Sequence, residues 1–248
     1  MSTAFHPVRR AVILAAGNGD RFHSPARDSK LLQPLLGRPI LLRTIAAAAD
    51  AGVEHITLVL GYQAARVQAL AERAALPRLR LSFVFNPLWP LENGVSALAA
   101  RDVVSDDRFA LLMGDHVFEP GILARMLAEP VAGDRSLLAI DTRPVPQAIA
   151  DEATKVRLAG TRIVAIGKDL RDYDALDTGV FVCAPSLFDA LEAAQRQDGD
   201  TTLSGGIRRL AQSGLMHGFD IGDAGWCDID TAADLAAAES ALAVNNAA

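Results

Sequence analysis

The chain has 248 residues, of which 50% are hydrophobic and 22% charged, with a formal net charge of −6 and a pI of about 5.3. This length and apolar content suffice for one large α/β domain or at most two small ones. The acidic balance and the lack of long basic runs argue against a nucleic-acid-binding surface. No apolar run approaches the roughly 18 residues of a membrane span, so we expect a cytoplasmic protein without one.

The N-terminal residues and the cysteines support this expectation. Arg9 and Arg10 precede the apolar residues 11–16 in a signal-peptide-like order. However, the apolar run is too short and no convincing cleavage site follows. Cys183 and Cys227 lie in no Cys-x-x-Cys or zinc pattern, which predicts two reduced thiols of a cytoplasmic protein.

The first half of the chain alternates apolar strands with amphipathic helices. This alternation predicts a parallel sheet with right-handed crossovers. The expected strands are residues 11–16, 56–60, 81–85 and 109–113, and the expected helices are 39–51, 63–74 and, after a loop at 86–94, a helix to about 101.

The second half has a mixed pattern that includes a hairpin. We expect strands at 137–141, 155–158, 163–166, 180–183 and 216–220, and helices at 185–194, 204–212 and about 232–242. No linker-like segment separates the halves. We therefore predict a single domain, residues 1–248, with one lobe at about 8–133, a second at about 134–235, and a C-terminal helix and tail at 236–248.

The turn after the first strand is a candidate phosphate site. It reads Gly17-Asn18-Gly19 and is followed by Arg21 and Lys30. Small residues allow close approach of a ligand, and turned backbone N–H groups suit an anion. The turn lacks the Gly-Lys-Ser/Thr of a Walker loop and the third glycine of a dinucleotide fingerprint. A surface turn with scattered charges is the alternative.

Three aspartates are candidate metal ligands. Asp115 follows the strand at 109–113, so it and the Gly17 turn both lie at carboxyl ends of strands and can share a crevice. Asp228 and Asp230 alternate along one segment, which places them on the same face if it is extended. Mg²⁺ prefers a few hard oxygen ligands. The pattern predicts Mg²⁺ on Asp115 with Asp228 or Asp230, and a turn or cap is the alternative for each.

Three basic residues are candidates for contacting a second substrate. A phosphate nucleophile is ionised at neutral pH and needs no base, so His116 is expected to be structural or to contact an acceptor. Lys155 and Lys168 are candidates for an acceptor phosphate. A solvated hairpin lysine is the alternative for Lys155.

Together these motifs resemble those of the sugar-phosphate nucleotidyltransferases. The similarity runs from Arg10 to about Leu235. It includes the opening motif with Arg21 and Lys30, Met113-Gly114-Asp115, Asp177-Thr178-Gly179 and Trp226-Cys-Asp228-Ile-Asp230-Thr231. The resemblance implies an α/β, GT-A-like fold: a Rossmann-like, mostly parallel mixed sheet flanked by helices, with an acceptor-binding subdomain.

A narrower resemblance is to the CTP:inositol-1-phosphate cytidylyltransferases. The residues that carry it include Leu112–His116, Glu152–Val156 and Ile166–Leu170. It implies Mg²⁺-dependent transfer of CMP from CTP to inositol 1-phosphate, giving CDP-inositol and pyrophosphate. The resemblance also implies that the protein acts together with a separate membrane CDP-alcohol phosphotransferase. Independently of the resemblance, the hairpin in the second half is a candidate homodimer surface.

The resemblance also implies a set of site residues. Arg21, Lys30, Asp115 and Lys168 would be catalytic, and Asp115, Asp228 and Asp230 would bind metal. The nucleotide-binding set would be Ala15, Ala16, Gly17, Asn18, Gly19, Asn93, Gly94, Ser96 and Gly114. The acceptor-binding set would be His116, Lys155, Lys168, Asp177, Thr178 and Gly179.

Two alternatives remain open at this stage. One is the same chemistry with another acceptor, such as phosphocholine, a phosphonate or a hexose 1-phosphate, using CTP or UTP. The other is a catalytically silent, nucleotide-binding regulatory subunit. The second alternative predicts loss of the charged site residues, and they are all present.

Overall fold

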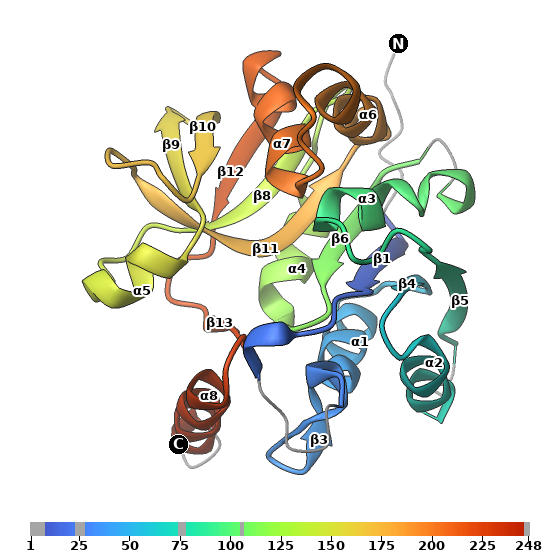
Figure 1. Cartoon of the computed structure of the whole chain (residues 1–248). Helices are drawn as coiled ribbons and strands as arrows, with labels where there is room; N and C mark the ends of the chain where they lie inside the picture. Colours follow the sequence, from blue (N-terminus) through green and yellow to red (C-terminus); the bar gives the residue numbers. More distant parts are fainter. Residues whose placement is uncertain (1–7, 23–27, 74–77, 105–106, 246–248) are drawn as a thin grey trace.

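A computed structural model describes residues 8–22, 28–73, 78–104 and 107–245. Its centre is a nine-stranded mixed sheet with the order β5-β4-β1-β6-β11-β8-β12-β10-β9 (Figure 1). The strands are β1 (Arg10–Ala15), β4 (His55–Leu60), β5 (Arg80–Phe85), β6 (Phe109–Met113), β8 (Ser136–Asp141), β9 (Lys155–Ala159), β10 (Arg162–Gly167), β11 (Ala175–Cys183) and β12 (Met216–Asp220).

The first four strands of this order are parallel and keep a constant register. β1 pairs with β4 from Arg10 opposite His55 to Ala15 opposite Leu60, and with β6 on its other side. Their near-continuous apolar sequences are typical of strands that are covered on both faces. All four therefore end at the same edge of the sheet, as predicted.

The sheet changes direction at β11. This strand is antiparallel to β6, β8 and β9, and its register with β8 shifts between Asp177 and Phe181. β12 is again parallel to β8. The expected hairpin is β9–β10, which carries a second register shift. The two halves of the chain thus share one sheet.

Helices cover both faces of the sheet. One face packs on α1 (Ile40–Asp50), α2 (Ala64–Arg73) and α4 (Pro120–Ala128), and the opposite face packs on α3 (Asn93–Leu98), α6 (Ser186–Asp198) and α7 (Leu203–Gln212). Alternate strand residues divide between the two cores: Ile13 faces the first, and Val12 and Leu14 face the second. This is the alternation that a pleated strand imposes.

Several small elements lie outside the main sheet. β13 (Trp226–Asp228) pairs with β7 (His116–Phe118), and β2 (Pro34–Leu35) pairs with β3 (Arg38–Pro39). α8 (Ala232–Asn245) follows β13 and lies below it in Figure 1. It packs through Ala238 against a third core that contains Phe22, Leu35, Ile40, Val117 and Ile229. The remaining elements are α5 (Gln147–Glu152) and the 3-10 turns η1 (Asp20–Phe22), η2 (Lys30–Leu32) and η3 (Arg101–Val103).

The sequence patterns missed the shortest elements and one longer helix. No expectation covered β7, β13, α5 or α4, although Pro120 at the start of α4 is a helix-start signal. The expected helix to about residue 101 divides into α3 and η3. Within the described residues, no helix has the length and apolar character needed to cross a membrane.

Candidate functional site

The turn at Gly114 and Asp115 connects the end of β6 to the start of β7 and lies against the end of β1. The Gly114 N–H donates to the Leu14 carbonyl at 3.0 Å. A Cβ at residue 114 would lie 2.8 Å from the same oxygen, so only glycine allows this approach. Thr44 Oγ1 donates to the carbonyls of Gly114 and His116, at 3.2 Å each. The turn is thereby fixed beside the end of β1, where the glycine loop begins.

The short ribbon β7–β13 brings Asp228 to Asp115. Asp228 lies opposite His116 in the ribbon. The His116 Nε2 atom is 3.3 Å from Asp228 Oδ1 and 3.9 Å from Asp115 Oδ1. One ligand atom from each of the three side chains lies within 4.8 Å of the others. We call Asp115, His116 and Asp228 the carboxylate–histidine cluster.

The position of His116 is fixed from its other ring nitrogen. Nδ1 lies 2.8 Å from the Thr178 carbonyl, and because a carbonyl only accepts, Nδ1 carries the hydrogen. This leaves Nε2 as the nitrogen that faces the two aspartates. Gly179 makes room for the ring: its φ is +74°, and a Cβ there would lie 2.1 Å from Nδ1. Metal-binding histidines commonly donate their second N–H to a backbone carbonyl in this way.

The charges in the cluster stabilise one another. Burial alone would lower the pKa of His116, but the negative charge of Asp228 outweighs burial and raises the pKa to about 10. Burial would raise the pKa of Asp228, and the His116 imidazolium holds that pKa below its usual range instead. In the absence of a metal, protonated His116 is therefore the counter-charge of Asp228.

The cluster has the chemistry of a divalent-metal site. Asp228 Oδ1 is buried and makes no hydrogen bond of standard geometry within the described part of the chain, although His116 is close. A buried carboxylate oxygen without such a bond is costly unless a cation completes its environment. Two carboxylates suit Mg²⁺ or Mn²⁺, which complete their coordination shells with water and phosphate oxygens. These residues fit a bound divalent metal.

Lys30 connects Asp115 to Asp230. Its buried Nζ lies 2.6 Å from Asp115 Oδ2 and 2.6 Å from Asp230 Oδ1. Burial would lower the pKa of Lys30, and the two carboxylates outweigh it and hold that pKa above its ordinary value. Asp230 therefore pairs with Lys30, whereas Asp228 belongs to the carboxylate–histidine cluster. The two predicted alternatives for the second metal ligand thus occupy different environments.

Arg21 extends the charged network to the second half of the chain. Its guanidinium pairs with Asp230 and lies 3.5 Å from Glu152 Oε2 of α5. Sequence reasoning placed Glu152 in a segment that carries the narrower resemblance but assigned it no role, because an exposed acidic residue has no chemical signature of its own. Both predicted phosphate-binding cations, Arg21 and Lys30, are thus brought to the carboxylate–histidine cluster.

The predicted nucleotide loop has two different glycines. A Cβ at Gly17 would meet nothing within 4 Å, which leaves open space beside the backbone. Gly19 has a φ of +65°, and a Cβ there would lie 3.1 Å from Lys30 Cγ. Ala15 and Ala16 are buried below the turn, and Asn18 is partly exposed. The loop is therefore built for a close approach on the Gly17 side.

Three other residues of the predicted nucleotide-binding set, Asn93, Gly94 and Ser96, have structural contacts. Asn93 Oδ1 accepts a hydrogen bond from the Leu203 N–H at 2.8 Å, and Ser96 Oγ accepts one from Asn86 Nδ2 at 3.0 Å. A Cβ at Gly94 would lie 2.6 Å from the Thr201 carbonyl. The contacts of Asn93 and Gly94 hold α3 against the start of α7, and that of Ser96 holds α3 to Asn86 after β5, so the three residues have a packing function whether or not they contact a nucleotide.

The two predicted acceptor lysines line one pocket. The other residues that line it include Gln147, Asp151, Arg171 and Tyr173. Lys155 is buried, and its Nζ donates to the Lys168 carbonyl at 2.6 Å, so the solvated-hairpin alternative for Lys155 is wrong. Through this hydrogen bond, Lys155 fastens the segment that presents the exposed side chain of Lys168.

Asp177, Thr178 and Gly179 lie at the start of β11, next to the cluster. The Gly179 N–H donates to Asp177 Oδ1 at 2.8 Å. Burial raises the pKa of Asp177 to about 6, although this hydrogen bond acts in the opposite direction. Thr178 is buried, and its Oγ1 donates to the Ala139 carbonyl at 2.9 Å. The start of β11 therefore packs directly against His116.

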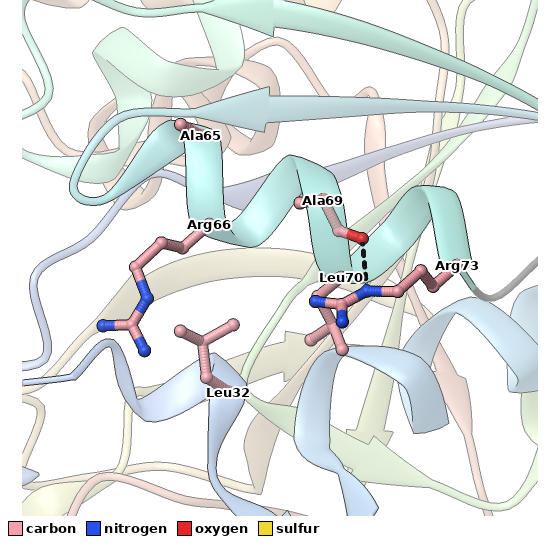
Figure 2. A pocket seen from close by; sticks show the side chains of 6 residues that line it. All are labelled: Leu32, Ala65, Arg66, Ala69, Leu70 and Arg73. Atoms are coloured by element: carbon pink, nitrogen blue, oxygen red, sulfur yellow. Dashed lines mark hydrogen bonds between the residues drawn. The ribbon is translucent and has the colours of Figure 1, made fainter.

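A second pocket lies outside this network. Figure 2 shows it between Leu32 and α2, with the side chains of Arg66 and Arg73 at its rim. Arg73 Nε donates to the Ala69 carbonyl at 3.0 Å, and Arg66 pairs with Asp28. None of the predicted site residues lines this pocket. It therefore contributes no group to the site described above.

Sequence reasoning also missed a group of residues behind the cluster. Asp141, Arg143 and Trp226 form a hydrogen-bonded unit next to β13. Trp226 belonged to a recognised motif without an assigned role. Asp141 carried the same signal as Asp115, a carboxylate at the end of an apolar strand, and that signal could have identified it.

Comparisons with known proteins identify the family of the chain. A family model described as a MobA-like NTP transferase domain matches residues 11–213. A bifunctional IPC transferase and DIPP synthase from Rubrobacter xylanophilus is 37% identical over 233 residues, which are 92% of this chain and 51% of the relative. A CMP-5'-(3-aminopropyl)phosphonate synthase from Streptomyces rubellomurinus is 32% identical over 250 residues, covering 91% of this chain and 37% of that protein. The chain thus spans about half the length of these relatives or less.

Solved structures agree along nearly the whole chain. The inositol-1-phosphate CTP transferase from T. maritima has a TM-score of 0.79 and 25% identity, with 95% of this chain and 96% of that chain covered. A UDP-glucose pyrophosphorylase from Acinetobacter has the same TM-score of 0.79 at 20% identity, which is a likeness of fold. The predicted nucleotidyltransferase fold is confirmed.

Proposed function

The chain belongs to the MobA-like NTP transferase family, and we propose that it transfers CMP from CTP to inositol 1-phosphate, releasing pyrophosphate. The observation that carries this proposal is the meeting of Arg21, Lys30 and the carboxylate–histidine cluster at the ends of β1 and β6. The T. maritima inositol-1-phosphate CTP transferase, which matches from end to end, supports the choice of substrates.

In this proposal, the two sides of the site have distinct tasks. The open turn at Gly17 and the cations Arg21 and Lys30 bind the triphosphate of CTP. Lys168 orients the phosphate of the acceptor. An oxygen of this phosphate attacks the α-phosphorus in line, a P–O bond forms, and the bond to the β-phosphate oxygen breaks as pyrophosphate leaves. The acceptor phosphate is already ionised, so catalysis is mainly positioning and charge neutralisation.

Asp115 and Asp228 would hold a divalent metal, with His116 beside them. When bound, Mg²⁺ would supply positive charge to the α-phosphate and the departing oxygens. Lys30 adds a fixed positive charge next to Asp115. Asp230 keeps both Lys30 and Arg21 close to the cluster. We assign Asp230 to this orienting role, and Asp228 to the metal.

A second acceptor class is favoured by one observation. The relative from Streptomyces rubellomurinus is named for a CMP-phosphonate product, and it matches 91% of this chain. A phosphonate presents the same charged oxygens to Lys168 as a phosphate ester does. The second candidate is therefore cytidylyl transfer to a phosphonate.

The test is pyrophosphate release over a grid of CTP, UTP, ATP and GTP against inositol 1-phosphate, phosphocholine, aminoalkylphosphonates and glucose 1-phosphate. We expect the largest kcat/KM with CTP and inositol 1-phosphate, and no release after chelation of divalent metal. Release with CTP and a phosphonate alone would select the second candidate. No release with CTP and any acceptor would contradict both.

The cellular setting is also part of the proposal. The bifunctional relatives are named for a second, DIPP synthase function, and the region matched here accounts for 51% of the one from Rubrobacter xylanophilus. We propose that CDP-inositol passes to a membrane CDP-alcohol phosphotransferase. The two free cysteines favour the cytoplasm. Dimerisation through the β9–β10 hairpin stays a prediction that sedimentation would test.

A further inference from the structure

We propose that Asp141, acting through Trp226 and Arg143, is a positioning residue that sets the place of Asp228 for metal binding. The inference rests on the metal assignment of the proposed function, and not on the identity of the acceptor. The structure carries it through a continuous path of hydrogen bonds from the main sheet to the short ribbon that holds the cluster.

Asp141 is a buried anion with several donors. It ends β8, and its carboxylate accepts hydrogen bonds from Arg143 Nε at 2.9 Å, from an Arg143 terminal nitrogen at 2.8 Å and from Trp226 Nε1 at 2.8 Å. Burial would raise the pKa of Asp141, but these hydrogen bonds outweigh burial and lower it, so the carboxylate is ionised. Its oxygens are therefore strong acceptors with fixed directions.

Trp226 connects this anion to Asp228. The two residues are separated by one position in β13, so they project from the same face of the strand. The indole ring also lies beside the His116 imidazole, with 6.3 Å between the ring centroids. A displacement of Trp226 would therefore move both a proposed metal ligand and its histidine neighbour.

The chain that enters β13 is fastened by the same network. Arg143 donates to the carbonyls of Asp223 at 3.2 Å and Ala224 at 3.1 Å. The Gly225 N–H donates to Glu119 Oε1 at 2.6 Å, and the Glu119 N–H donates to the Gly225 carbonyl at 3.0 Å.

β13 itself pairs with β7 and with no strand of the nine-stranded sheet described here. The Asp141–Trp226 hydrogen bond is therefore a direct side-chain link between that sheet and the ribbon.

A role in positioning explains why a charged pair stands here. Asp141 is 3% exposed, whereas the Arg143 side chain is 39% exposed. An ion pair with a solvent-exposed partner typically contributes little to stability, so stability alone does not require Asp141 and Arg143 at this position. Groups that orient metal ligands typically change metal affinity or activity by about 10- to 100-fold when they are replaced.

The test measures Mn²⁺ affinity directly, by electron paramagnetic resonance of free Mn²⁺, on the full chain without substrates. Asp141→Asn removes the charge, and Trp226→Phe removes the N–H donor while keeping an aromatic ring. We expect the Mn²⁺ Kd to rise about 10- to 100-fold in the first and about tenfold in the second. Trp89→Phe is the matched control, because Trp89 is the only other tryptophan, and its Kd should be unchanged.

Thermal unfolding of each variant separates positioning from a structural role. A structural role would lower the unfolding midpoint and leave the Mn²⁺ affinity of the folded protein unchanged. That result in both variants would overturn the inference. If Asp141→Asn does not fold, Trp226→Phe decides alone.

Failure of the metal assignment gives a different result. In that case, the wild-type chain would bind Mn²⁺ no better than Asp115→Asn, which would overturn the inference together with the metal site. Absence of cytidylyl transfer to inositol 1-phosphate, with Mn²⁺ binding intact, would affect the proposed function alone.

Discussion

The two halves of the sheet are built in different ways. β5, β4, β1 and β6 are parallel and pair residue by residue without a shift. On the other side, β11 and the β9–β10 hairpin are antiparallel, and both contain register shifts. The regular half ends in the glycine loop and Asp115, whereas the irregular half supplies Thr178, Gly179 and the pocket lined by Lys155 and Lys168. His116 and Asp228 lie where the halves meet.

This difference shows how the fold separates two tasks. A regular parallel edge presents backbone N–H groups and strand-end side chains in a fixed arrangement, which suits a triphosphate. The shifted register of β11 allows Gly179 to adopt a positive φ and to accept the His116 ring. We therefore expect substitutions in the two halves to affect different substrates, and substitutions at the junction to affect the chemical step.

The largest effect is expected at the junction, for Asp115→Asn. Loss of this charge weakens the metal site and leaves Lys30 with one carboxylate partner. Because metal charge contributes several kcal/mol to the transition state, kcat should fall about 10³-fold. Because kcat is measured at saturating CTP and acceptor, higher concentrations of either substrate should not restore the rate.

The matched control for this prediction is Asp102→Asn, an exposed carboxylate in η3. Its kcat should equal that of the wild-type chain. Wild-type kcat for Asp115→Asn at saturating Mg²⁺ would remove Asp115 from the mechanism.

An intermediate effect is expected from one glycine in each half. Gly179→Ala combines a positive φ with a Cβ that would lie 2.1 Å from His116 Nδ1. The free energy of unfolding should fall by about 3 kcal/mol, from backbone strain and overpacking together. Urea unfolding monitored by circular dichroism measures this loss.

Gly17→Ala is the counterpart in the regular half. Nothing lies within 4 Å of the added Cβ, so stability should change by less than about 0.5 kcal/mol. The KM for CTP should rise about tenfold, because the methyl group narrows the approach to the phosphate turn, and one charge-assisted hydrogen bond lost corresponds to about this factor. Equal unfolding and equal CTP kinetics in the two glycine variants would break the comparison between the halves.

The smallest effects are expected from two exposed cations. Lys168→Ala should raise the KM for the acceptor about tenfold and leave the KM for CTP unchanged. Arg21→Ala should raise the KM for CTP about tenfold and leave the KM for the acceptor unchanged. Initial rates with each substrate varied at saturation of the other measure both constants. A parallel rise of both constants in either variant would mean that the two sides of the site are not separate.

The regular half could be predicted closely from the sequence, for physical reasons. Residues 11–16, 56–60 and 109–113 are apolar on both faces and are bounded by turn residues, so pattern alone locates β1, β4 and β6. Asp115 at a strand end and Lys30 after the glycine loop were identified from the same rules. The comparisons confirmed the fold and family that these motifs indicated.

The other half could not be predicted to the same depth. β7 and β13 have three residues each and are defined by pairing with one another across a long sequence separation, which leaves no local signal. The buried state of Lys155 depends on the Lys168 carbonyl, a contact that hydrophobic periodicity does not encode. The separate environments of Asp228 and Asp230 likewise follow from tertiary contacts, because strand alternation places both on one face.

The β7–β13 ribbon has a consequence for the order of folding. β7 follows β6 directly, whereas β13 follows β12 near the end of the described chain. Their pairing is a non-local contact that closes a long loop, and such contacts form late because the entropy of loop closure opposes them. His116 and Asp228 therefore come together only after both halves of the sheet have assembled. Metal affinity should be the last property that the chain acquires on refolding, and a metal that binds only the assembled site would stabilise the native state in proportion to the logarithm of its concentration.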